Sequence, residues 1–61
     1  MQENHEQLAY SIPDAARMMG MSAEWLWKRV RAGEITPIRI GRRVLLERRE
    51  IERYLEAARS R

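Results

Sequence analysis

The sequence predicts a mainly α-helical domain with one small β-hairpin, in the order helix, turn, helix, two-stranded hairpin, helix. Three observations predict this order. Two short helical segments are separated by little more than a glycine, Gly20. The stretch Arg39–Val44 carries a glycine between two strand-like segments, which is typical of a hairpin. Between Ile51 and Ala58, apolar residues recur at the spacing of one helix face.

The first helix is predicted from the residues at its ends. Ser11 can cap the amino end, Pro13 falls in the first turn, and Asp14 completes a pattern like a capping box. Gly20 follows at the position where a left-handed residue ends a helix, so the helix spans about two turns. The apolar side chains that gather on one face are Ile12, Ala15, Ala16 and Met19.

The second helix is predicted over Ala23–Ala32, with Ser22 as its cap and Gly33 just beyond its end. Because the link from the first helix is so short, the two helices must cross steeply, which is typical of a helix-turn-helix. The buried stripe of the second helix is expected to comprise Leu26 and Val30, flanked by Ala23 and Trp27. The opposite face is expected to carry Glu24, Lys28 and Arg31, with Trp25 at its edge.

The hairpin is predicted from the strand-like segments Thr36–Ile40 and Arg43–Leu46. Gly41 between them supplies the positive φ that tight hairpin turns need. Strand alternation puts the two isoleucines of the first segment on one face and Arg39 on the other. Three guanidinium groups at the tip suit a phosphate backbone, with an ordinary solvated turn as the alternative. They belong to Arg39, Arg42 and Arg43.

The third helix is predicted over Arg49–Ala58. Its apolar stripe repeats as i, i+3, i+4, i+7 and comprises Ile51, Tyr54, Leu55 and Ala58. The other face mixes acids and arginines at pairing distance, namely Glu52, Glu56, Arg49, Arg53 and Arg59. We interpret that face as mainly solvated, because such pairs contribute little to stability.

Together these elements predict a compact winged helix-turn-helix, in which the hairpin is the wing. One domain is expected over residues 10–59, preceded by a flexible leader over residues 1–9. The expected core comprises Ile12, Ala16, Met19, Leu26, Val30, Ile38, Ile40, Val44, Leu46, Ile51 and Leu55.

Composition argues against several classes of function. A chain of 61 residues is near the lower limit for a single core without staples, and it leaves little room for a catalytic cleft. There is no cysteine, and His5 has no second ligand nearby, so neither a metal site nor a cofactor is expected. No apolar run is long enough to cross a bilayer, and residues 1–7 are polar and acidic. We therefore expect a cytoplasmic protein that is not an enzyme.

Charge is distributed unevenly along the chain, whose net charge is +3. Residues 1–27 hold one Arg against four acids, whereas residues 28–61 hold eleven Lys or Arg against five acids. Arginine is the choice at eleven of the twelve cationic positions, which favours forked contacts to phosphates and guanine edges. A membrane surface is the competing polyanion, but no helix pairs a lysine-rich face with a broad apolar one. Nucleic acid is therefore the expected partner.

Several landmarks fall in the order and spacing of a known family. They are Tyr10–Ser22 with its paired alanines before a glycine turn, the Gly-Glu-Ile within Val30–Ile35 followed by Pro37, the Arg-Ile-Gly-Arg-Arg run Arg39–Arg43, and Ile51–Leu55. The chain resembles the helix-turn-helix proteins of the excisionase type, which are related to the DNA-binding head of MerR regulators. Such proteins occur among phage and plasmid recombination directionality factors. The resemblance covers Tyr10–Leu55, most of the chain.

The resemblance implies that the second helix enters the major groove of double-stranded DNA while the wing reaches the adjacent phosphates or minor groove. The helix residues expected at the DNA are Ser22, Glu24, Trp25, Lys28, Arg29 and Arg31, and those of the wing are Arg39, Arg42 and Arg43. Lys28 suits guanine acceptors and Glu24 a cytosine amine. An acid in the first turn also simply complements the helix dipole, so Glu24 has two interpretations. The arginines are expected to hold phosphates.

Two residues depart from the family pattern. Trp25 stands where a small or polar residue is usual, and three interpretations stay open. It could pack across thymine methyl groups, fill a gap in the core, or meet a neighbouring copy. Leu45 lies on the outward side of the second wing strand, where a charged residue is frequent. An exposed leucine is usually of no consequence, and a protein contact is the alternative.

The resemblance also implies an architectural role. Excisionases bind neighbouring sites as several copies that contact one another, bend the DNA and bias a partner integrase toward excision, without catalysis. One helix and one wing cover few base pairs, so cooperation between adjacent copies is expected. Two alternatives stay open: a small transcriptional regulator of the same fold, such as an AlpA-like activator or a repressor, and a module that binds an acidic protein.

Overall fold

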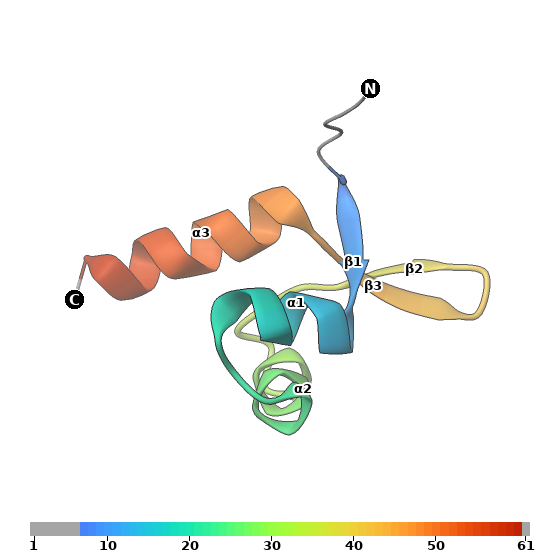
Figure 1. Ribbon diagram of the computed structural model, residues 1–61, viewed down its shortest axis with the longest axis horizontal. Coiled ribbons are helices and arrows are strands. Elements are labelled where there is room, and N and C mark those ends of the chain that lie inside the picture. Colours follow the sequence, from blue (N-terminus) through green and yellow to red (C-terminus); the bar gives the residue numbers. More distant parts are fainter. Residues whose placement is uncertain (1–6, 61) are drawn as a thin grey trace.

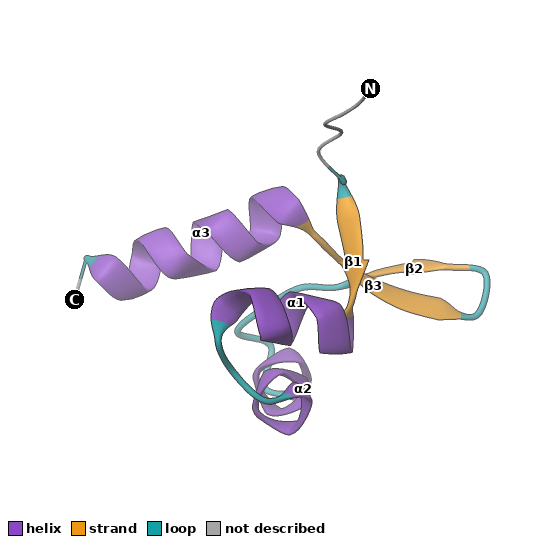
Figure 2. Cartoon of the chain, in the orientation of Figure 1, coloured by secondary structure: helices purple, strands orange, loops and turns teal. Residues whose placement is uncertain are grey.

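A computed structural model describes residues 7–60, which form a three-stranded antiparallel sheet and three helices (Figure 1). In chain order the elements are β1 (Ala9–Ser11), α1 (Ile12–Met19), α2 (Ala23–Arg31), β2 (Ile38–Ile40), β3 (Arg43–Glu47) and α3 (Arg48–Arg59). The wing, formed by β2 and β3, projects to one side of α1, and α3 extends to the other side (Figure 2). The winged helix-turn-helix order that the sequence predicts is confirmed.

The caps of α1 and α2 form as the sequence predicts. The Ser11 hydroxyl accepts the backbone N–H of Asp14 at 3.2 Å, and the Ser22 hydroxyl accepts that of Trp25 at 3.1 Å. Each hydroxyl thereby satisfies one of the amide groups that the first turn leaves unpaired. Gly20 ends α1 with φ +80°, in the left-handed region that favours glycine.

Small side chains let α2 lie close against α1. Ala15 and Ala16 of α1 are fully buried, and so is Leu26, which projects from the middle of α2. Only the short turn around Gly20 separates the two helices, so α2 has little freedom except to cross α1 steeply. This packing is the helix-turn-helix unit.

The sheet contains a strand that the sequence did not predict. Strand β1 pairs with β3, opposite β2, so that β3 lies in the middle of the sheet in the order β1-β3-β2. Ala9, assigned to the leader, is therefore part of the sheet. The strand is only three residues long and pairs with residues more than thirty positions away, so no local sequence pattern predicts it. The predicted leader's residues 1–6, including His5, lie outside the described residues.

The pairing register decides which face of the wing meets the core. Cross-strand partners share a face, and Leu46, which is fully buried, shares its face with its partner Tyr10 and with Val44 two residues away. The other face carries Leu45 and its partner Ile38. The outward face predicted for Leu45 is therefore confirmed, although its side chain is half-buried rather than exposed. The core position predicted for Ile38 is wrong.

The core is smaller than predicted and includes two residues outside the predicted list, Ala15 and Ile35. Its buried members are Ile12, Ala15, Ala16, Leu26, Ile35, Leu46 and Ile51. Ile40 is 59% exposed and Leu55 41% exposed, so their predicted core positions are wrong. Ile40 lies near the wing tip on the face opposite Leu46. The predicted core residues Met19, Val30 and Val44 are half-buried around the core.

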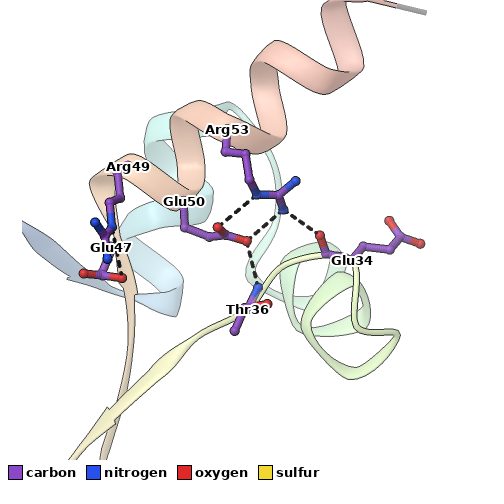
Figure 3. Close-up of polar contacts among 6 residues, drawn as sticks. All are labelled: Glu34, Thr36, Glu47, Arg49, Glu50 and Arg53. Atoms are coloured by element: carbon purple, nitrogen blue, oxygen red, sulfur yellow. Dashed lines mark hydrogen bonds and ion pairs between the residues drawn. The ribbon is translucent and has the colours of Figure 1, made fainter.

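The loop between α2 and β2 is fastened to α3 (Figure 3). Ile35 in this loop is fully buried, and the next residue, Thr36, donates its backbone N–H to Glu50 Oε2 at 3.0 Å. Arg53 Nη2 donates to the carbonyl of Glu34 at 3.0 Å. Arg53 also donates to Glu50 through Nε at 3.0 Å and Nη2 at 2.8 Å. Two side chains of α3 thus bind the backbone of the loop.

The buried position of Ile35 predicts a large loss of stability when its side chain is shortened. I35A is expected to lower the free energy of unfolding by about 2–5 kcal/mol, because the missing methylenes leave a cavity. Urea unfolding followed by circular dichroism measures this change. The matched variant I40A makes the same change at an exposed position and is expected to stay within about 0.5 kcal/mol of the wild type. Equal losses in the two variants would contradict the assigned core.

The Glu50 hydrogen bonds predict a dependence of stability on pH. The hydrogen bonds from Arg53, and secondarily that from the Thr36 N–H, hold the pKa of the Glu50 carboxyl below its ordinary value, against an opposing effect of burial. A depressed pKa stabilises the folded state above the unfolded-state pKa of ~4.3, and this contribution disappears as pH falls through the lower folded-state value. The wild type should therefore be more stable than E50Q at neutral pH, and the difference should shrink on acidification. A difference that stays constant in urea titrations across this range would refute the assignment.

Candidate nucleic-acid interface

Ion pairs divide the cations of the protein into two groups. Six arginines have a carboxylate partner: Arg17 with Asp14, Arg29 with Glu34, Arg48 with Glu52, Arg49 with Glu47, Arg53 with Glu50, and Arg59 with Glu56. Within residues 7–60, the cations that make no ion pair are Lys28, Arg31, Arg39, Arg42 and Arg43. All five belong to α2 or the wing, so the uncompensated positive charge is concentrated on these two elements.

The exposed face of α2 is the one that helical spacing predicts. Glu24, Lys28 and Arg31 are exposed, whereas Leu26 on the opposite side is fully buried. Ser22 is exposed at the amino end, where its hydroxyl caps the helix. Two cations and one acid therefore face outward from a helix that its packing on α1 holds in place.

The wing arginines lie around the tip of the hairpin. Gly41 adopts φ +61° in the turn, and Arg42 follows it. Arg39 shares a face with its partner Val44, and Arg43 shares the opposite face with its partner Ile40. All three arginines are exposed. The tip thus presents positive charge on both faces and at its end, which suits insertion between two rows of phosphates.

Two of the predicted DNA-contacting residues are engaged within the protein. Trp25 is half-buried and meets Tyr54 of α3 edge to face, with ring centroids 6.1 Å apart and planes at 74°. The Arg29 guanidinium lies 5.1 Å from the centroid of the Trp25 ring, and its Nε is 3.6 Å from Glu34 Oε1. Of the three interpretations of Trp25, the structure favours packing against the core. A DNA contact by Trp25 or Arg29 stays a prediction.

The role of Glu50 and Arg53 could not be predicted from the sequence. Arg49, Arg53 and Arg59 were expected to pair with Glu52 and Glu56. This is confirmed for Arg59 with Glu56, whereas Arg53 pairs with Glu50 and Arg49 with Glu47 of β3. The spacing of three residues between Glu50 and Arg53 indicates a pair. Nothing in the sequence indicates that both side chains also reach the loop after α2, because that arrangement depends on the tertiary fold.

Two further observations concern metal binding and membrane spans in the part of the chain that the structure describes. Within residues 7–60, there is no group of three or more His, Cys, Asp or Glu side chains that could hold a metal ion. None of the described helices combines the length and apolar character that a membrane span requires.

The packing of α2 on α1 across a glycine turn, followed by the wing, defines a helix-turn-helix protein. The family model described as "Helix-turn-helix domain" matches residues 9–59, and the chain belongs to this family. Comparison with curated proteins gave no match, and comparison with solved structures gave none. Membership in a helix-turn-helix family indicates DNA as the partner. The match begins at Ala9, so it includes β1.

The unpaired arginines of the wing predict a change in the salt dependence of DNA binding. The double variant R42A/R43A is expected to weaken binding to specific and random duplexes together. It should also flatten the slope of log K against log salt by up to ~0.9 for each phosphate that the wing no longer neutralises. Fluorescence anisotropy over a salt series measures the slope. The matched control R49A/R59A removes two arginines that have carboxylate partners on α3 or beside it, and should change the slope much less. An unchanged slope in R42A/R43A would remove the wing from the interface.

Proposed function

We propose that this protein is a sequence-specific architectural DNA-binding protein of the excisionase type. It binds adjacent sites cooperatively, bends the DNA and directs an integrase toward excision, with no catalytic role of its own. The observation that carries the proposal is the concentration of unpaired cations on α2 and the wing. The resemblance of Tyr10–Leu55 to excisionases supports the finer assignment.

In this proposal α2 reads bases from the major groove. Lys28 is at the centre of its exposed face and donates to guanine acceptors, while Glu24 one turn earlier accepts from a cytosine amine. Arg31 holds a phosphate beside the groove, and the three wing arginines hold the neighbouring phosphates or enter the minor groove. The wing therefore supplies affinity, and α2 supplies the reading of sequence.

Cooperation between copies follows from the size of the domain. A single α2 and a single wing cover few base pairs, too few for the specificity that a genome requires. No segment of the chain offers a long heptad repeat for a stable dimer in free solution. Neighbouring copies on DNA, and an integrase beside them, are the proposed protein partners.

A footprint over a candidate attachment region tests the proposal. We expect several evenly spaced protected repeats that fill together as the protein concentration rises. K28A should lose the specific pattern, whereas R59A, whose arginine is paired with Glu56 on α3, should keep it. Independent filling of the repeats would contradict cooperation, and the absence of any footprint would favour an acidic protein as the partner instead.

An excision assay with the cognate integrase separates the proposed role from transcriptional regulation. Adding the protein is expected to raise excision and lower integration. A protein that binds the repeats but leaves the direction of recombination unchanged would be assigned as a regulator of the same fold.

A further inference from the structure

We propose that Glu50 and Arg53 are positioning residues for DNA binding, which fix the wing relative to α2 by holding the loop between them. Neither residue is proposed to touch DNA. The inference rests on the proposed function, because it concerns how the two DNA-binding elements are held at a fixed angle.

The loop of residues 32–37 is the direct covalent link between α2 and the wing. The backbone N–H groups of residues 32–34 donate to carbonyls at the end of α2, whereas residues 35–37 have no backbone hydrogen bond of this kind and no regular secondary structure. Ile35 anchors its middle in the core. On either side of this anchor, the carbonyl of Glu34 and the N–H of Thr36 form hydrogen bonds with side chains of α3. The loop is therefore fixed at three successive residues, immediately before the wing begins.

The pair on α3 is suited to holding this loop rigidly. The two parallel hydrogen bonds from Arg53 to Glu50 form a fork, which restricts both side chains to one geometry. The Glu50 side chain is only 15% exposed, so water competes weakly for its oxygens. Its Oε2 atom accepts from Arg53 and from Thr36 at once, which makes the carboxylate the centre of the arrangement (Figure 3).

Helix α3 also touches α2 directly. Tyr54, next to Arg53, packs edge to face on Trp25 of α2. Helix α3 therefore touches α2 through Tyr54 and the loop before the wing through Glu50 and Arg53. Strand β2 has only one strand neighbour, β3, so the hydrogen bonds to the loop add to the anchor at Ile35 in constraining the chain just before β2. We expect that removing those hydrogen bonds leaves α2 packed on α1 but loosens the wing.

A second pair on α3 provides a matched comparison. Glu56 and Arg59 have the same spacing as Glu50 and Arg53, with Arg59 Nη1 3.0 Å from Glu56 Oε1. Their side chains are 66% and 74% exposed, and within residues 7–60 neither side chain hydrogen-bonds outside α3. E56A therefore removes the same charge from the same helix without releasing the loop.

The test compares E50A with E56A in the full chain, by anisotropy titration of a labelled random-sequence duplex over a salt series. E50A is expected to flatten the slope of log K against log salt by at least ~0.9, because a loosened wing releases at least one phosphate. E56A is expected to keep the wild-type slope. Circular dichroism at the titration temperature establishes that each variant is folded. Should E50A not fold, E50Q and R53K take its place, since each weakens the fork while keeping the bulk of the side chain.

A double-mutant cycle separates positioning from general destabilisation. E50A should flatten the salt slope little further in the R42A/R43A background, because the wing there keeps only Arg39 to hold a phosphate, but it should have its full effect on the slope in the K28A background. The inference would be overturned if E50A and E56A gave the same salt slope. It would also be overturned if E50A weakened DNA binding equally in the R42A/R43A and K28A backgrounds. If the wild-type protein itself shows no salt-dependent binding to duplex DNA, the proposed function is wrong. This result is seen without any variant, so it is distinguishable from a failure of the inference about Glu50 and Arg53.

Discussion

The close packing of α2 on α1 is the interaction on which the other features depend. Two alanines of α1 leave room for Leu26, and the three side chains together exclude water from the centre of the domain. In a chain of this size few other residues are available for a core, so the orientation of α2 is tied to the stability of the whole domain. A helix held in this way can present a fixed row of polar side chains to a partner.

Ion pairing then determines where positive charge remains on the surface. The three acids of α3 pair with three arginines of that helix, and Glu47 of β3 pairs with the fourth, Arg49. Glu34 and Asp14 pair with Arg29 and Arg17. Exposed pairs of this kind add little stability, but they remove net charge from most of the surface. What remains positive is α2 and the wing. The distribution of acids along the sequence therefore helps to decide where a polyanion is attracted.

The parts of the structure that the sequence predicts are those that local signals determine. Serine caps, the Gly20 turn and helical periodicity are sufficient to predict α1, α2 and the exposed face around Lys28. Strand alternation separates the two faces of the wing but cannot say which one meets the core, which is why the core positions predicted for Ile38 and Ile40 are wrong. The β1 pairing, the burial of Ile35 and the interactions of Trp25 and Glu50 join segments far apart in the chain. No local pattern specifies such interactions.

The position of β2 at the rim of the sheet has a consequence for the free protein. An edge strand such as β2 leaves backbone donors and acceptors unpaired on one side, and these can pair with a strand of another molecule. Here the rim strand carries Arg39, and Arg42 and Arg43 follow it, all without ion-pair partners within residues 7–60. Two edge strands that carry these arginines repel each other, so the charges that suit a polyanion also oppose aggregation through strand pairing. Replacing these arginines to weaken DNA affinity would remove that protection as well.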